Sequence, residues 1–264
     1  MIFDTHAHYD NKAFDEDRET LLNSLAENGV ESIINVGASL QSVKNTLQLI
    51  RQYSFIYGSV GVHPSEAKEL TDSWMDWLET AATEEKVVAI GEIGLDYYWK
   101  EPEPQLQKYW FIRQLGLARK VNLPVIIHSR DAAKDTLDIL KNEKAGEIGG
   151  VVHCFSYGVE MAREYLNLGF YLGIGGVLTF QNGKKLKDVV RYMPLSRILL
   201  ETDCPYLSPV PFRGKRNSSL YLPYVGEAIS QIKNIPPEEV IAATNQNARK
   251  MIRNIPYNNS ICAG

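Results

Sequence analysis

Short apolar runs rich in valine and isoleucine alternate along the chain with longer amphipathic stretches. Eight runs of this kind occur, at residues 1–4, 32–36, 56–62, 87–93, 124–127, 150–152, 170–174 and 198–200. Such short continuous runs are typical of strands that are buried on both faces in a parallel sheet. Successive runs start 20 to 37 residues apart, which leaves room for a loop and a crossover helix between strands.

The stretches between these runs show helical spacing. In residues 17–28, leucines at 21, 22 and 25 recur at helical intervals, and Gly29 follows as a C-terminal cap. Residues 105–120 repeat the pattern. Eight strand–helix units without a break in composition predict an α/β fold, a single-domain (β/α)8 TIM barrel. We place this domain at residues 1–253 and expect residues 254–264 to form a loose tail.

A doubly wound open sheet is the competing architecture. It would need fewer strands, and it often carries a glycine-rich phosphate loop. The run Gly173-Ile174-Gly175-Gly176 resembles such a loop, but Leu178 stands where its third glycine should be. The barrel is therefore the favoured prediction.

Composition limits the class of protein. The 264 residues carry a net charge of −4 and are 44% hydrophobic, so the chain has no general attraction for nucleic acid and can form a large core. Its three cysteines, Cys154, Cys204 and Cys262, show no paired spacing, which fits a reducing cytoplasm. The sequence shows neither a signal peptide nor an apolar run near 18 residues. We expect a cytoplasmic protein with no membrane contact and no evident protein partner.

All five histidines lie at the end of one of the apolar runs. His6 and His8 follow the first, His63 the third, His128 the fifth and His153 the sixth. Active sites of α/β barrels are built at the carboxyl ends of the strands. Each histidine alone could be a core residue bonded to the backbone, but together they indicate one shared site. His6 and His8 would point to the same side of a strand and could bind one divalent ion.

Two carboxylates extend this set. Glu92 lies inside an apolar run between glycines, where a charge is costly unless it is paired or bound to metal. Asp203 follows the eighth run, and its alternative interpretation is a helix-cap or turn aspartate near proline. Glu201 shares a face with Asp203, so it could support the site or form a buried ion pair. Asp4 and Asp96 could cap loops, and we give them no role.

These residues occur within motifs that resemble the TatD family of metal-dependent hydrolases, a branch of the amidohydrolase superfamily whose members are deoxyribonucleases. The resemblance extends from the first residues to about Arg253. Its specificity comes from six motifs in the same order: DTHAH (4–8), GVHP (61–64), GEIGLD (91–96), HSR (128–130), HCFS (153–156) and ETDCPYL (201–207).

The resemblance implies a (β/α)8 hydrolase with two divalent metal ions. It assigns the first ion to His6, His8, Glu92 and Asp203, and the second to Glu92, His128 and His153. Glu92 would bridge them, because a carboxylate has two oxygens and can span ions about 3.5–4 Å apart. Histidines favour zinc and similar metals, whereas carboxylates and phosphoryl chemistry suit magnesium or manganese. Mg, Mn and Zn therefore all stay open.

The expected catalytic residues are Asp203, His63 and Glu92. Asp203 could take a proton from the attacking water, and His63 could donate to the phosphate or the leaving oxygen, with a purely structural role as its alternative. Substrate binding is expected from Arg130 and from the loop with Arg213, Lys215 and Arg216, which is otherwise a solvated loop. Tyr97-Tyr98-Trp99 could stack nucleobases or pack as a lid.

The leading prediction is a metal-dependent phosphodiesterase, an exonuclease that trims single-stranded or frayed DNA, with RNA as an open alternative. The acidic charge of the protein favours a short contact with one end of a DNA strand. A small-molecule amidohydrolase or lactonase with the same metal site is the second hypothesis. A non-catalytic metal-binding or scaffold protein is the third.

Overall fold

A computed structural model describes residues 1–252, so the prediction for residues 254–264 lies outside the described part of the chain. Eight strands form one sheet in the order of the sequence, each parallel to the next. The strands are β1 (Ile2–Ala7), β2 (Val30–Val36), β3 (Ile56–Val60), β4 (Val87–Asp96), β5 (Val125–Arg130), β6 (Gly150–Val152), β7 (Tyr171–Ile174) and β8 (Ile198–Leu200).

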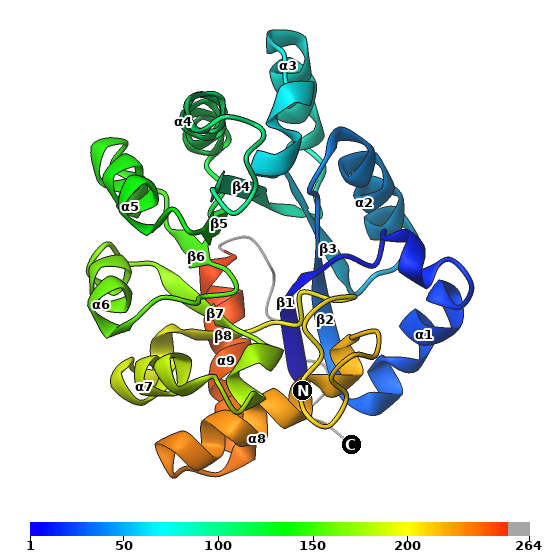
Figure 1. Ribbon diagram of the computed structural model, residues 1–264. Helices are drawn as coiled ribbons and strands as arrows, with labels where there is room; N and C mark the ends of the chain where they lie inside the picture. Colours follow the sequence, from blue (N-terminus) through cyan, green and yellow to red (C-terminus); the bar gives the residue numbers. More distant parts are fainter. Residues whose placement is uncertain (253–264) are drawn as a thin grey trace.

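The sheet closes on itself between its first and last strands. Ala7 at the end of β1 forms a parallel bridge with Cys204, just beyond β8. The hydroxyl of Thr5 donates to the carbonyl oxygen of Leu200 over 3.0 Å, and the backbone N–H of Asp203 donates to that of His6 over 2.8 Å. Figure 1 shows the strands at the centre with the helices around them. The predicted (β/α)8 barrel is confirmed.

Helices surround the barrel, and those that follow the strands cover its outer face. The α-helices are α1 (Arg18–Ser24), α2 (Leu40–Gln52), α3 (Asp72–Ala81), α4 (Pro104–Val121), α5 (Ala133–Asn142), α6 (Val159–Asn167), α7 (Lys184–Tyr192), α8 (Leu222–Lys233) and α9 (Pro237–Met251). Short 3-10 helices are η1 (Lys12–Phe14), η2 (Ala26–Asn28), η3 (Pro64–Glu69), η4 (Ala145–Glu147), η5 (Gly176–Thr179), η6 (Leu195–Arg197) and η7 (Ser219–Tyr221). None of the helices in residues 1–252 is long and apolar enough to cross a membrane.

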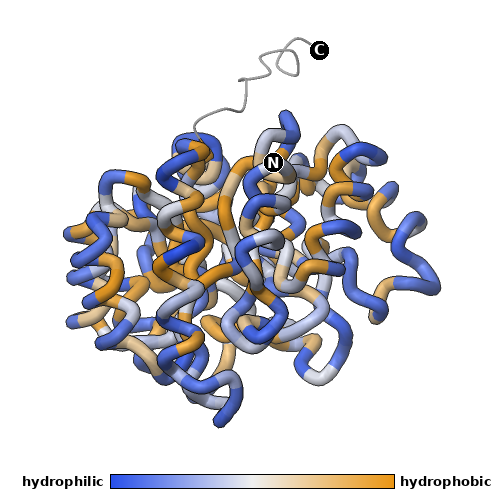
Figure 2. Tube along the Cα trace, turned by 90° about the horizontal axis from the view of Figure 1, so that it is seen from above, coloured by the Kyte–Doolittle hydropathy of each residue, from blue (hydrophilic) through white to orange (hydrophobic). Residues whose placement is uncertain are grey.

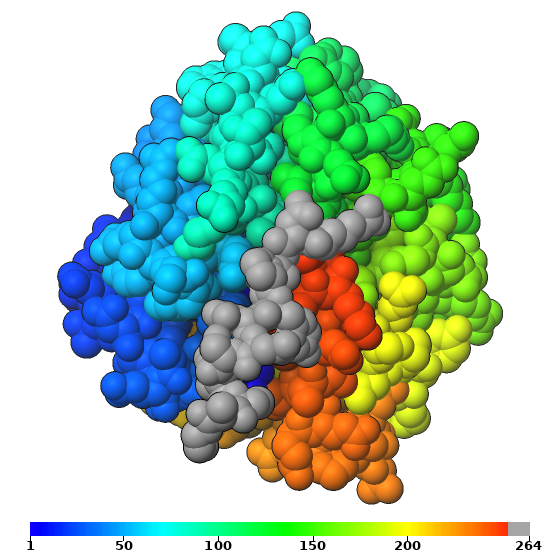
Figure 3. Space-filling view, turned by 180° about the vertical axis from the view of Figure 1, so that it is seen from behind, coloured from blue at the N-terminus to red at the C-terminus, as the bar shows by residue number. Residues whose placement is uncertain are grey.

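The core has two parts. The larger lies between the strands and the helices, and hydrophilic residues occupy much of the outer surface (Figure 2). The smaller joins side chains of several strands, among them Phe3, Ile126 and Leu199, to Ala248 and Met251 of α9. In Figure 3 α9 lies over the middle of the rear face. This helix therefore packs against one side of the barrel and leaves the carboxyl ends of the strands for a site.

Candidate active site

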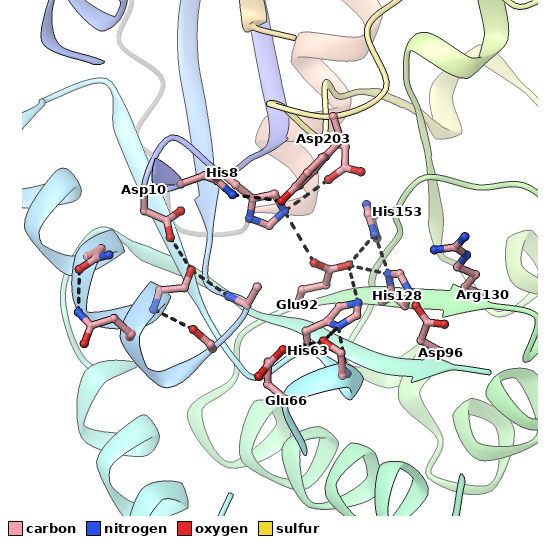
Figure 4. Close-up of a pocket in the computed structure, with 18 of the residues that line it drawn as sticks. His8, Asp10, His63, Glu66, Glu92, Asp96, His128, Arg130, His153 and Asp203 are labelled. Carbon is pink, nitrogen blue, oxygen red and sulfur yellow. Dashed lines mark hydrogen bonds and ion pairs between the residues drawn. The ribbon is translucent and has the colours of Figure 1, made fainter. Parts of the chain in front are cut away.

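The predicted histidines and carboxylates lie at the carboxyl ends of six strands and face one another. Figure 4 shows Glu92 between His8 and Asp203 on one side and His128 and His153 on the other. Three of these residues lie on strands: His6 on β1, Glu92 on β4 and His128 on β5. The other four follow a strand: His8 follows β1, His63 follows β3, His153 follows β6 and Asp203 follows β8. Asp203 holds a left-handed backbone, with φ of 57°, a conformation that aspartate tolerates better than most residues.

Four of these side chains present donor atoms at the spacing of metal ligands. The Nε2 atoms of His6 and His8 are 3.1 Å apart, and Oδ1 of Asp203 lies 3.8 and 3.4 Å from them. Oε2 of Glu92 lies 3.6 Å from His6 Nε2 and 3.8 Å from His8 Nε2. Ligands about 2.1 Å from a tetrahedral ion are about 3.4 Å apart. The four side chains therefore fit one divalent ion.

The other oxygen of Glu92 faces a second group. Its Oε1 lies 2.8 Å from Nδ1 of His128 and 2.7 Å from Nε2 of His153, and these two nitrogens are 3.3 Å apart. The two oxygens of one carboxylate thus serve two neighbouring groups of donors. This is the arrangement that a bridging carboxylate between two metal ions requires.

Outer contacts orient the imidazoles. Nδ1 of His8 lies 2.9 Å from the carbonyl oxygen of Val36, which can only accept, so the neutral ring keeps its lone pair on Nε2 toward the site. Nε2 of His128 lies 3.1 Å from Oδ2 of Asp96. Hydrogen bonds of this kind hold metal-ligating histidines in one orientation and tautomer. Within the described residues, Nδ1 of His6 and of His153 have no hydrogen-bond partner.

The electrostatics of the cluster reflect burial and close charges. Burial alone would raise the pKa of Glu92, but His153, His63 and His128 hold that pKa well below its usual range. Burial, together with the neighbouring His153, lowers the pKa of His6 to about 4. Burial also opposes the charged form of His8, yet Asp203 and Glu92 raise its pKa to about 9. Protons and metal ions therefore compete for the same donor atoms, and metal affinity will depend on pH.

His63 stands beside the second group of donors. Its Nδ1 accepts from the backbone N–H of Ser65 over 3.1 Å, so the neutral ring carries its proton on Nε2. That Nε2 lies 3.9 Å from Oε1 of Glu92, and the ring meets the ring of His128 edge-on at 4.2 Å. His63, Glu92 and His128 also present three donor atoms within 4.8 Å of one another. His63 can therefore act as a hydrogen-bond donor or lie at a metal.

A cavity of about 820 Å³ opens over these groups. Arg130 lines it, as predicted for a substrate-binding residue near His128. The other three predicted cations are not among its lining residues. Arg216 pairs with Asp17, and the guanidinium carbon of Arg213 lies 4.1 Å from the centre of the Phe180 ring. Lys215 lies 5.9 Å from the centre of the Phe212 ring. This geometry favours structural roles for these three residues.

Two carboxylates matter more than their sequence positions suggest. Asp4 is fully buried and accepts from the backbone N–H and hydroxyl of Thr202 and from the hydroxyl of Ser219. Asp96 binds His128 through Oδ2 and the backbone N–H of Tyr98 through Oδ1. Side chains alternate between the two faces of a strand, so Asp4 lies on the same face as His6, and Asp96 on the same face as Glu92. This spacing is the sequence feature from which both carboxylates could have been predicted.

Two further residues flank the ligands. Glu201 is buried, and its Oε1 lies 3.8 Å from Nδ1 of His153, consistent with the supporting role or ion pair expected for it. Within residues 1–252 the cysteines at 154 and 204 form no disulfide, and burial raises the pKa of both thiols. Neither is therefore suited to act as a thiolate nucleophile.

Comparison with known proteins identifies relatives of this chain. The family model described as "TatD related DNase" matches residues 3–253. The metal-dependent hydrolase YabD of Bacillus subtilis is 44% identical over 96% of this chain and 99% of its own. The metal-dependent hydrolase YcfH of Escherichia coli is 38% identical over 95% of each chain.

Solved structures agree with this relationship. The crystal structure of YjjV, a TatD homologue from Escherichia coli, superposes with a TM-score of 0.91 at 32% identity and covers 97% of this chain and 98% of its own. A TatD-family hydrolase from Entamoeba histolytica superposes with a TM-score of 0.87 at 25% identity over 96% of this chain and 98% of its own.

The barrel and these relatives define the protein as a metal-dependent hydrolase. Within that class, the chain belongs to the TatD family.

Proposed function

We propose that this hydrolase cleaves phosphodiester bonds of DNA at a chain end, using two divalent ions held by His6, His8, Glu92, His128, His153 and Asp203. The observation that carries the proposal is the position of Glu92, whose two oxygens face two separate groups of donor atoms at the floor of the cavity. A matched family model described as a DNase supports the choice of substrate.

Divalent ions bound here would stabilise charge on a phosphoryl group and lower the pKa of a bound water. Asp203 lies next to His8, with its carboxylate directed at the shared centre, and serves as acceptor for the proton of the attacking water. His63 presents an Nε2–H toward the same centre and donates to the phosphate or the leaving oxygen. Glu92 contacts both groups of ligands and so fixes the distance between them.

A chain end suits the charge of the cavity. Among the described residues that line the cavity, Arg130 is the single arginine or lysine, and Asp10, Glu66 and Glu69 line it as well. Long stretches of backbone would meet repulsion from these acidic groups, whereas one phosphate next to Arg130 would not. An exonuclease that contacts one or two nucleotides is therefore favoured over an enzyme with a long binding groove. Single-stranded DNA and frayed ends are the proposed substrates.

The charge of the cavity also supports a second candidate function. Neutral and acidic residues such as Asn11, Gln41 and Asn45 line the cavity beside Asp10. A small neutral ester or amide would meet no repulsion from them, so an amidohydrolase or lactonase is the alternative function. Arg130 separates the two candidates. Its replacement by alanine should impair cleavage of a phosphodiester far more than cleavage of a neutral ester or amide.

Digestion of a 5′-labelled single-stranded oligonucleotide tests the proposal. Chelator-treated protein should leave the strand intact, and addition of Mg²⁺, Mn²⁺ or Zn²⁺ should produce successively shorter products. Comparison of 5′ and 3′ labels gives the polarity, and RNA of the same sequence tests the choice of sugar. Glu92→Gln should abolish cleavage with the fold retained. A strand that stays full-length with every metal would contradict the nuclease function.

A further inference from the structure

We propose that Trp99, with Tyr98 and Arg130, forms a binding subsite for the nucleobase next to the scissile phosphate. This inference rests on the proposed nuclease function and specifies how its substrate is held. Tyr98 and Trp99 follow β4, and Arg130 ends β5, two residues after His128. The subsite therefore lies at the carboxyl ends of the two strands that carry Glu92 and His128.

Arg130 is held in a defined position by an aromatic ring. Its guanidinium carbon lies 3.7 Å from the centre of the Tyr98 ring, the distance of a stacked cation–π contact. No salt bridge of Arg130 with a carboxylate occurs among residues 1–252. The N–H groups at the edge of the guanidinium are thus available for a phosphate, and Tyr98 orients them.

Trp99 has the exposure of a binding residue and not of a core residue. Tyr98 and Trp99 are 54% and 56% exposed, and their rings meet edge-on at 4.8 Å. Trp99 lines the same cavity as His128 and Arg130. A large aromatic side chain that stays half open to solvent in the same cavity as a cation is typical of platforms on which bases stack.

The subsite is coupled to the proposed metal site through Asp96. One oxygen of this carboxylate lies 3.1 Å from Nε2 of His128, and the other accepts from the backbone N–H of Tyr98 over 2.9 Å. The backbone N–H of Tyr97 also donates to the carbonyl oxygen of Arg130 over 2.9 Å. These contacts fix the start of the aromatic segment relative to the ligands, so a base on Trp99 would place its phosphate at a constant position.

The charge of the cavity selects the occupant. In Figure 4 Arg130 and Asp10 lie on opposite sides of Glu92, and the acidic residues Glu66 and Glu69 also line the cavity. A ligand that joins an anion to a flat aromatic group is complementary to the Arg130 side, which combines a cation with exposed aromatic rings. A nucleotide is such a ligand. The further inference is therefore a preference for phosphodiesters that carry a base on this side.

Binding of two short strands tests the subsite. The probes are a labelled thymidine tetramer and an abasic tetramer of the same length, both with phosphorothioate linkages that resist hydrolysis, measured by fluorescence anisotropy on metal-loaded protein. Trp99→Ala should lower the affinity for the thymidine tetramer by about 5- to 150-fold, the range given by a stacking energy of about 1–3 kcal/mol. The abasic tetramer should lose much less, and Trp99→Phe should recover most of the affinity.

Tyr109→Ala is the matched control, because Tyr109 is 50% exposed and lies beside both a tryptophan and an arginine on α4, outside the cavity lining. It should change the affinity for neither strand. Equal losses for both strands in Trp99→Ala, or none, would overturn the subsite. If the wild-type protein cleaves a base-free phosphodiester while Trp99→Ala shows either of these results, the subsite alone fails. If the wild type neither binds the strands nor cleaves any phosphodiester, the proposed function fails with it.

Discussion

Glu92 and the residues around it illustrate what single positions contribute to this site. The side chain of Glu92 is almost fully buried, and histidines compensate its charge. The ligand candidates could be predicted from the sequence because histidine is scarce and all five copies lie at strand ends. Asp4 could not be assigned a role in this way, because its partner Thr202 lies 198 residues away. Only the closed barrel brings them together.

Asp96→Asn tests the support of His128. The amide cannot match the charge-assisted contact with Nε2 of His128, so the ring should lose its fixed orientation. Metal affinity or activity should fall by about 10- to 100-fold, the usual cost of removing an outer partner of a metal-binding histidine. Titration of chelator-treated protein with Zn²⁺ or Mn²⁺ measures the affinity. Asp188→Asn, which alters a surface ion pair with Arg191, is the control. The expectation is wrong if both variants bind metal as the wild type does.

Glu201 should make the metal-free protein less stable as pH rises. Burial raises the pKa of this carboxyl from 4.5 to about 8 in the folded state. The unfolded chain binds fewer protons between these values, so the contribution of the group is full below about pH 4.5 and declines as pH rises toward 8. The slope approaches about 1.4 kcal/mol per pH unit for one proton.

The matching experiment is urea unfolding of chelator-treated protein at several pH values. Glu201→Gln should flatten the decline, because the amide does not ionise. Glu164→Gln, at an exposed ion pair with Lys141, should leave it unchanged. Identical pH profiles for wild type and Glu201→Gln would refute the assignment.

The strands and helices followed the hydrophobic pattern closely, and their departures have physical causes. Residues 105–120 form most of α4, which begins at Pro104. Proline is well suited to this first position, because the N–H that it lacks would have no acceptor within the helix. The strand predicted at 87–93 extends to Asp96, because Asp96 still pairs with Arg130 of β5. The extension depends on pairing with the neighbouring strand β5. The sequence could not show it, because the run of apolar residues ends before Asp96.

The loop after β8 shows where sequence proximity misleads. Its cations lie near Asp203 in the chain, but Arg216 turns to Asp17, with side chains 35% and 44% exposed. Removing such an exposed pair costs about 0.2–1 kcal/mol. The guanidinium lowers the pKa of Asp17, so this contribution is present at neutral pH and is lost as pH falls through the folded pKa.

Arg216→Ala should therefore lower stability slightly, and less so in 1 M salt, where the Debye length is about 3 Å. Arg130→Ala should raise the KM for oligonucleotide far more than Arg216→Ala does. Urea unfolding and steady-state kinetics on both variants check these expectations, with Arg191→Ala as a surface control. If Arg216→Ala raises KM as much as Arg130→Ala, the substrate-binding role predicted for this loop from the sequence is correct.

At the scale of the whole molecule, the alternation of strand and helix was enough to predict one barrel. The packing of α9 against the barrel interior was not foreseen, because its apolar residues follow ordinary helical spacing and only the tertiary contacts of Ala248 and Met251 reveal it. The site joins residues from the first strand of the barrel and from the segment after the last, as in the pair of His6 and Asp203. Metal binding should therefore stabilise the entire fold.

Removal of metal should lower Tm by about 5–10 °C for each ion that is lost. A ligand at 100 times its Kd adds about 2.7 kcal/mol to stability, and each kcal/mol shifts Tm by about 2–4 °C in a domain of this size. Differential scanning calorimetry with and without chelator measures the shift, and Glu92→Gln should lose most of it. An unchanged Tm after complete removal of metal would contradict a site that links distant strands.

Anomalous X-ray diffraction from crystals of the Mn²⁺- or Zn²⁺-loaded protein would locate the bound ions directly. A two-metal site around Glu92 predicts two anomalous peaks about 3.5–4 Å apart, on either side of Glu92, one among His6, His8 and Asp203 and the other beside His128 and His153. Peaks elsewhere in the molecule, or no peak in contact with Glu92, would contradict it.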